Sequence, residues 1–166
     1  AANDARRNGM AGRVIAAAGG DVDGKHIALL GLSFKPNTDD VRESPVLDII
    51  PALLDAGASM SVFDPAAMTT AAQALDQHVA HAIDWAENAY ATAENADILV
   101  IVTEWNEFRA LDLAQLRDTM NDTLIVDLRN IYKREEMQEY GFTYYSVGRS
   151  PVLSGKDEGL KSVSTG

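Results

Sequence analysis

Apolar residues in the chain form short continuous runs that alternate with segments where they recur every three or four positions. The continuous runs are typical of buried parallel strands, and the spaced positions are typical of helices that pack one face on a sheet. We expect strands at 26–31, 59–64, 98–102, 123–127 and 142–147, with a further short strand around 78–83. We expect helices at 66–75, 84–96, 113–120 and 134–140. This alternation predicts the α/β class, with a doubly wound, mainly parallel, Rossmann-like sheet of about six strands.

Signals at the ends of these elements divide the chain into three segments. The first 18 residues are rich in Ala and lack Pro, so they predict a helix that ends at Gly19. Ser44 and Pro45 have the residue types of a helix N-cap and first turn, and an apolar helical face follows them. We expect part of a long helix at 1–20, one α/β domain at 24–149 and a flexible tail at 150–166. Because the chain opens on Ala in a helical pattern, we also expect it to be a piece of a longer protein.

The charge balance and the rare residue types exclude several classes of function. With 14 Lys plus Arg against 25 Asp plus Glu, the net charge is −11, which repels nucleic acid and anionic membrane surfaces. The sequence has no cysteine, and its three histidines are not spaced like metal ligands, so no thiolate nucleophile and no metal site are expected. No apolar run approaches the roughly 18 residues of a membrane span. A cytoplasmic location is therefore expected.

Three cations follow predicted strands, at the edge where parallel α/β sheets bind ligands. Lys35 and Arg42 lie in the loop after the first strand, and Arg129 lies after the strand at 123–127. In so acidic a chain this grouping indicates an anion site, because a guanidinium can hold a phosphate by two hydrogen bonds. Alternatively, Lys35 and Arg42 pair with the acidic residues of their own loop, Asp39, Asp40 and Glu43. Both interpretations stay open at this point.

Other candidate residues have a structural explanation beside the functional one. Trp105 either stacks on a base or locks its loop to the core. Asp64, Thr103 and Asp127 stand at strand ends, where catalysis is one role and a turn or helix cap is another. Tyr144 and Tyr145 are expected to be ordinary strand residues. The glycine-rich fingerprints G-x-G-x-x-G and G-x-x-x-x-G-K-[ST] are absent, which disfavours a cofactor-binding Rossmann domain.

Four motifs in order, FKPNTDDVRESP, TEWNEF, DLRNIY and YYSVGR, resemble the C-terminal UDP-binding domain of the UDP-glucose 6-dehydrogenase family. The resemblance covers roughly 24–149, and the segment at 1–20 resembles the end of the family's central, dimerising helix. The resemblance implies an enzyme that oxidises a UDP-hexose to its uronic acid with two NAD⁺ through a cysteine thioester. It also implies an amino-terminal NAD-binding Rossmann domain and a central helical region. The cofactor NAD would be bound mainly by that amino-terminal domain.

The resemblance assigns roles to four residues. Phe34, Lys35 and Arg129 resemble substrate contacts, and Arg42 resembles the arginine that reaches the NAD⁺ site of a neighbouring subunit. No residue resembles a catalytic group, because the family's cysteine has no counterpart in this chain. The chain is therefore expected to be inactive alone. Its expected partners are UDP-glucose or UDP-glucuronate, the rest of the dehydrogenase polypeptide, and further copies in a homodimer or larger homo-oligomer.

Three alternatives remain beside this assignment. GDP-mannose and UDP-N-acetylmannosamine dehydrogenases share the F-K-x-x-T-D-D-x-R loop, although TEWNEF is closer to the UDP-glucose branch. A phosphorylation-dependent receiver module is also a small doubly wound domain, but its acidic pair would lie at the end of the first strand. A purely structural domain that assembles through its first helix would bind no nucleotide.

Overall fold

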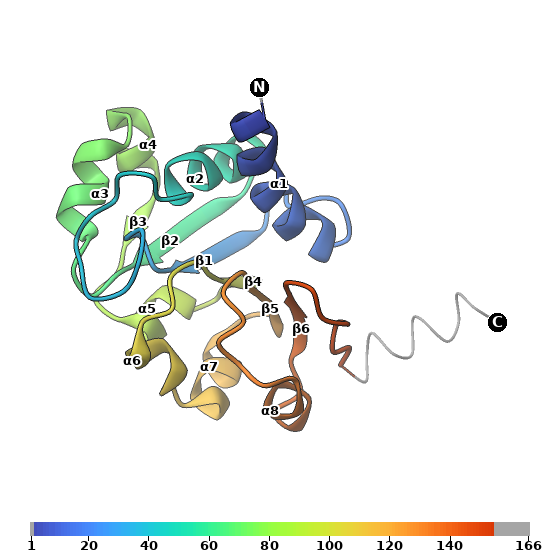
Figure 1. Cartoon of the computed structure of the whole chain (residues 1–166). Helices are drawn as coiled ribbons and strands as arrows, with labels where there is room; N and C mark the ends of the chain where they lie inside the picture. The colour runs from blue at the N-terminus through green and yellow to red at the C-terminus, as the bar shows by residue number, and fades with distance from the viewer. Residues whose placement is uncertain (1, 155–166) are drawn as a thin grey trace.

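The computed structural model of the chain describes residues 2–154, with side chains from Gly9 onward (Figure 1). Its centre is a six-stranded sheet in the order β3-β2-β1-β4-β5-β6, and every neighbouring pair is parallel. This arrangement confirms the doubly wound α/β fold. The strands are β1 (His26–Leu30), β2 (Ser59–Phe63), β3 (Asp84–Trp85), β4 (Ile98–Ile101), β5 (Leu124–Asp127) and β6 (Thr143–Ser146).

Helices cover both faces of the sheet (Figure 1). One core packs the first four helices on the sheet: α1 (Ala2–Ala17), α2 (Val46–Asp55), α3 (Met68–Ala74) and α4 (Gln77–Ala82). The other packs α5 (Ala89–Ala93), α6 (Asn106–Arg109), α7 (Leu113–Thr119) and α8 (Arg134–Glu139). Ile27 and Leu29 of β1 enter the first core, whereas Ala28 and Leu30 enter the second. The continuous apolar runs therefore arise because the central strands are buried on both faces.

Around residue 83, the predicted strand is wrong and the predicted helix at 84–96 is confirmed only in its middle part, as α5. The strand expected at 78–83 is helix α4, because Val79 and Ile83 are four positions apart and both turn inward onto the first core. The helix expected from 84 onward starts only after Asn88, whose side chain accepts a hydrogen bond of 2.8 Å from the Ala91 N–H. The two residues before that turn, Asp84 and Trp85, pair with β2 as strand β3 instead.

The start of α2 also differs from the expected cap. Pro45, not Ser44, occupies the N-cap position, and it makes no side-chain cap. The Ser44 hydroxyl donates to the Leu32 carbonyl at 2.8 Å, and its oxygen also accepts a longer hydrogen bond, of 3.4 Å, from the Val46 N–H at the start of α2. Ser44 thus ties the far end of the long loop after β1 back to the start of that loop.

The expected tail begins with residues that are held against the sheet. Val152 forms an antiparallel bridge with Tyr144 of β6, with N–H to O distances of 2.8 and 2.9 Å. Arg134 Nε donates to the Ser150 carbonyl at 2.8 Å. The remainder of the predicted tail, 155–166, lies outside the described residues.

The order of the strands places a candidate ligand-binding site at the carboxyl ends of the central strands. From β1 the chain winds outward through β2 and β3, returns to β4 beside β1, and then continues to β6. Ligands of open parallel sheets bind beyond the carboxyl ends of the strands at such a reversal. The loops that follow β1, β4 and β5 all start from this edge. Within residues 2–154, none of the helices has the length and apolar character needed to span a membrane.

Candidate functional site

The carboxylate of Asp64, just after β2, fixes the start of the loop that follows β1. Asp64 is 1% exposed. Its Oδ2 accepts hydrogen bonds from the N–H groups of Leu32 at 2.7 Å and Ser33 at 3.0 Å. Its Oδ1 accepts from Ala66 and Ala67 at 2.8 and 2.9 Å. A buried carboxylate with these donors holds backbone in place, so Asp64 has the structural role rather than the catalytic one.

Trp105 and Thr103 join the end of β4 to the same point. Trp105 Nε1 donates to Asp64 Oδ2 at 3.2 Å and to Ser33 Oγ at 3.3 Å. The Thr103 hydroxyl donates to the Ser33 carbonyl at 2.7 Å. Gly31 has φ +100°, and a Cβ there would lie 2.5 Å from the Thr103 backbone nitrogen, so only glycine permits this close approach. Trp105 therefore locks the loop, as its structural explanation predicts.

This arrangement does not fit a dinucleotide at the end of β1. In dinucleotide-binding sheets, the first loop offers free backbone N–H groups to the pyrophosphate. Here the N–H groups of Leu32 and Ser33 already donate to Asp64. The Asp64 carboxylate thus accepts the hydrogen bonds that the pyrophosphate of a dinucleotide would otherwise accept.

Arg42 pairs within its own loop, as the alternative to an anion site predicts. Its Nε and Nη2 donate to the two carboxylate oxygens of Asp40, each at 3.0 Å. The hydrogen bond from Arg42 holds the pKa of Asp40 below its ordinary value. The Arg42 side chain is nevertheless 87% exposed. It borders an open hollow shared with Thr70 and Gln73 of the α3 region.

Phe34 and Lys35 project from the same loop without such partners. Phe34 is 51% exposed, although its backbone N–H donates to the Asp40 carbonyl at 2.8 Å. Lys35 is exposed, and its ammonium forms no ion pair with any residue in the described part of the chain. These two side chains are available to a ligand at the carboxyl edge.

The loop after β5 is held by the aspartate that ends the strand. Asp127 is fully buried. Its Oδ1 accepts from the Arg129 N–H at 3.0 Å, and its Oδ2 accepts from Ile131 and Tyr132 at 2.8 and 3.2 Å. Asp127 is therefore an anchor for the backbone that carries Arg129, and not a catalytic acid.

The Arg129 side chain is oriented by Glu104 from the loop after β4. Its Nε donates to Glu104 Oε2 at 2.9 Å, and its Nη2 donates to the same oxygen. Partial burial of Glu104 is the largest single influence and opposes its ionisation. The hydrogen bond and charge of Arg129, a backbone hydrogen bond and the charge of Arg109 together outweigh burial and lower the pKa of Glu104. The Arg129 side chain is 46% exposed, and its Nη1 makes no hydrogen bond within the described residues. One edge of the guanidinium is thus left for a ligand.

The strand order brings the predicted cations to one edge. Only β4 separates β1 from β5, so the loops of Lys35 and Arg129 leave from strand ends about 10 Å apart. Glu104 and Trp105 lie after β4, between them. Among the described side chains, no group of three or more His, Asp or Glu is arranged to hold a metal ion.

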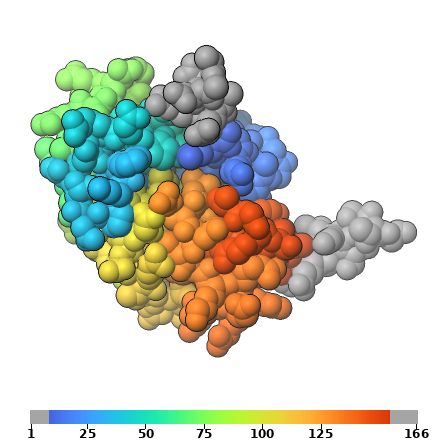
Figure 2. Space-filling model, viewed as in Figure 1, coloured from blue at the N-terminus to red at the C-terminus, as the bar shows by residue number. Residues whose placement is uncertain are grey.

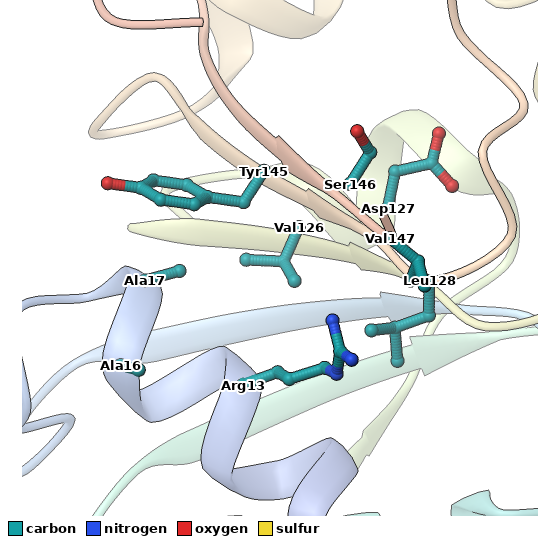
Figure 3. A pocket seen from close by; sticks show the side chains of 9 residues that line it. All are labelled: Arg13, Ala16, Ala17, Val126, Asp127, Leu128, Tyr145, Ser146 and Val147. Atoms are coloured by element: carbon teal, nitrogen blue, oxygen red, sulfur yellow. The ribbon is translucent and has the colours of Figure 1, made fainter. Parts of the chain in front are cut away.

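A pocket of about 230 Å³ lies beside this edge, between α1 and the ends of β5 and β6 (Figure 3). Val126, Leu128 and Val147 make much of its wall, and Arg13 extends from α1 toward Leu128. Arg13 is not predictable as a pocket residue from the sequence, because a cation inside an Ala-rich helix belongs to no motif. The space-filling view shows the segments that follow β1, β4 and β5 gathered on one side of the molecule (Figure 2).

The fold and this edge define a doubly wound α/β domain of the nucleotide-binding type, with its cations at the carboxyl ends of the strands. Residues 28–134 match the model of the UDP-glucose/GDP-mannose dehydrogenase family, UDP binding domain. The chain therefore belongs to this family and contains its UDP-binding domain.

Individual relatives agree with this membership. The chain is 51% identical over 149 residues to the UDP-glucose 6-dehydrogenase of Rhizobium meliloti (strain 1021), covering 90% of this chain and 33% of that protein. It is 41% identical to the UDP-glucose 6-dehydrogenase TuaD of Bacillus subtilis (strain 168), covering 80% of this chain and 28% of that protein. A solved UDP-glucose dehydrogenase of Pyrobaculum islandicum superposes with a TM-score of 0.62 at 32% identity, covering 76% of this chain and 27% of that one. The chain thus spans about a third of the length of the curated relatives it matches.

Proposed function

We propose that this chain binds the UDP-sugar in a UDP-glucose 6-dehydrogenase that oxidises UDP-glucose to UDP-glucuronate with two NAD⁺. The observation that carries the proposal is Arg129. Its backbone is fixed by Asp127, its guanidinium is oriented by Glu104, and its Nη1 has no partner among the described residues. Such a preoriented fork matches the oxygens of a diphosphate.

The residues of the loop after β1 complete the proposed site. Lys35 supplies a second, flexible positive charge from the other side of β4. Phe34 offers an exposed ring that a nucleotide can cover. In a chain of net charge −11, local cations are needed to overcome the repulsion of a diphosphate. Each charge-assisted contact would contribute about 1.5 to 3 kcal/mol.

The chemical step is proposed to belong to the rest of the dehydrogenase polypeptide. This chain has no cysteine to form a thioester, and the loop after β1 does not offer a dinucleotide its backbone N–H groups. The NAD⁺ would be bound by another domain, with Arg42 reaching it in a neighbouring subunit of a homo-oligomer. The high exposure of Arg42 is compatible with that role. The domain limits 1–20, 24–149 and 150–166 and a cytoplasmic location remain predictions.

A titration of the ¹⁵N-labelled chain, followed by NMR, tests the binding role. UDP is expected to shift the amide signals of the loops after β1 and β5 in a saturable way, and this method detects a Kd of about 1 mM, or roughly −4 kcal/mol. GDP is the matched control ligand for the alternative assignment, a GDP-mannose dehydrogenase. If GDP binds more tightly than UDP, the proposed substrate is GDP-mannose and not UDP-glucose. Absence of any saturable shift with UDP would overturn the proposal. Shifts caused only by Mg²⁺ with an acyl-phosphate mimic would favour a receiver module.

A further inference from the structure

Tyr144 of β6 is more than the ordinary strand residue that the sequence predicts. Its ring is fully buried in the second core, and its hydroxyl reaches the anchor of the Arg129 loop. The hydroxyl donates to Asp127 Oδ2 at 2.5 Å. Burial, together with this hydrogen bond to a carboxylate, raises the pKa of Tyr144, so the hydroxyl stays protonated and remains a donor.

Arg149 supports the same hydroxyl from the other side. Its Nη2 donates to the Tyr144 hydroxyl at 2.7 Å, and its Cζ lies 5.5 Å from the centre of the Tyr144 ring. Its Nε donates to Ser146 Oγ at 2.9 Å, and its Nη1 donates to the Tyr132 carbonyl at 3.2 Å. Arg149 and the buried carboxylate of Asp127 thus contact the same hydroxyl from Nη2 and Oδ2, so the guanidinium helps to fix the hydroxyl that Asp127 accepts from.

A third connection holds the same loop. Asn130 has φ +56°, and its side chain makes two hydrogen bonds to the backbone of Val147, at 2.9 and 2.8 Å. In the segment 127–132 only Arg129 and Asn130 are exposed. Since Asn130 is used to hold Val147, Arg129 is the exposed side chain left to act on a ligand.

We propose that Tyr144 and Arg149 are positioning residues, which hold Arg129 in the orientation that binds the diphosphate of the nucleotide. The proposal rests on the proposed function of the carboxyl edge and adds two residues that do not touch the ligand themselves. They act in sequence: Arg149 orients the Tyr144 hydroxyl, this hydroxyl and three backbone N–H groups fix Asp127, and Asp127 fixes the backbone of Arg129.

Removal of one hydroxyl tests this role. Tyr144→Phe keeps the buried ring, and we expect it to weaken UDP binding by about twofold to tenfold in the NMR titration. Signals of β1 to β3 should stay in place, which shows that the fold is retained. Tyr90→Phe is the matched control, because the Tyr90 hydroxyl accepts from the Asp112 N–H at 2.9 Å, away from the Arg129 loop. This control should leave UDP affinity unchanged.

A double-mutant cycle separates positioning from general loosening. In an Arg129→Ala background, Tyr144→Phe should cause no additional loss of UDP affinity, because its effect passes through Arg129. Arg149→Met provides a second variant and should behave in the same way. If Tyr144→Phe lowers UDP affinity equally with and without Arg129, the inference is overturned. It is also overturned if Arg129→Ala weakens binding while Tyr144→Phe and Arg149→Met both leave UDP affinity unchanged. If Arg129→Ala itself has no effect, the proposed site is wrong and the inference falls with it.

Discussion

The loops after β1 and after β5, both at the carboxyl edge of the sheet, have their backbones held in the same way but differ in how their charged side chains are held. In each, a buried aspartate accepts hydrogen bonds from backbone N–H groups. Asp64 holds the first two residues after Gly31, and the rest of this long loop is held at Asp39, whose carbonyl accepts from the Thr70 hydroxyl at 2.6 Å, and at Ser44. Asp127 holds the backbone of Arg129, Ile131 and Tyr132 in a much shorter segment.

The two loops differ in whether hydrogen bonds to other elements of the fold hold the charged side chain as well as the backbone. In the long loop, Arg42 pairs locally at the surface and Lys35 has no ion pair within the described residues. In the short loop, the guanidinium of Arg129 is oriented as well as its backbone. Binding costs less when a group is already in place, whereas a flexible ammonium adapts to the ligand. The edge therefore combines one preorganised cation with one adaptable cation.

Loss of the Asp64 anchor should produce the largest effect. Asp64→Ala leaves several buried N–H groups without an acceptor, and we expect the free energy of unfolding to fall by about 3 kcal/mol or more. Urea unfolding measures the loss. Hydrogen exchange should accelerate at Leu32 and Ser33 more than at Ile131. Asp76→Ala is the control, because Asp76 is exposed and makes no side-chain cap to α4. Equal protection of all three amides would contradict the separate anchoring of the two loops.

Removal of Arg129 should affect binding more than stability. Arg129→Ala is expected to weaken UDP binding by roughly one to two orders of magnitude, because a charge-assisted contact contributes about 1.5 to 3 kcal/mol. The free energy of unfolding should change by less than about 1 kcal/mol, since the pair with Glu104 is partly exposed. Arg117→Ala, an exposed cation on α7, should leave UDP affinity unchanged. An equal effect of both substitutions would show that only overall charge matters.

The ion pair between Glu104 and Arg129 should make a small contribution to pH dependence. Because the pKa of Glu104 is lowered on folding, its stabilisation is present above the ordinary carboxyl value and is lost as pH falls through the lowered one. With solvent screening, the loss between roughly pH 5 and pH 3 should stay below about 1 kcal/mol. Glu104→Gln should remove this part of the pH profile in urea unfolding. A profile that is identical in both proteins would mean that the pair contributes nothing.

Arg42 should give the smallest effect on the chain itself. Arg42→Ala should leave UDP affinity unchanged and alter the free energy of unfolding by less than about 0.5 kcal/mol, because the side chain is at the surface. In the complete enzyme, the same substitution should raise the KM for NAD⁺ more than that for the sugar nucleotide. A larger increase in the KM for the sugar nucleotide would move Arg42 into the substrate site.

The sequence predicts the central elements well and the contacts between them poorly. Strands β1 and β4 are continuous apolar runs, and this pattern has few explanations other than burial in a parallel sheet. The helix α4 escaped prediction because Val79 and Ile83 are too few to reveal its period. The position of Lys35, Arg42 and Arg129 after strands makes them candidates from the sequence alone, and their roles in binding remain predictions.

The hydrogen bonds among Asp127, Tyr144 and Arg149 are not predictable from the sequence for a different reason. The sequence places Asp127 at a strand end. Its hydrogen bond to Tyr144 joins positions 17 apart, and no local pattern indicates that the Tyr144 hydroxyl contacts a carboxylate. Arg149 has no sequence signal beyond its place in the motif YYSVGR. Such contacts depend on strand register, since β5 and β6 place Asp127 opposite Ser146, and register follows from the folded sheet.

The bridge between Val152 and Tyr144 has a consequence for how the protein behaves at high concentration. A strand at the rim of a sheet offers unpaired backbone groups to other chains, and this is a common route to aggregation. Here β6 is partly closed by the returning backbone of Val152, which uses both the N–H and the carbonyl of Tyr144. At the opposite rim, β3 is only two residues long. Within residues 2–154, neither rim presents a long template, so we expect the sheet to resist extension by a second molecule.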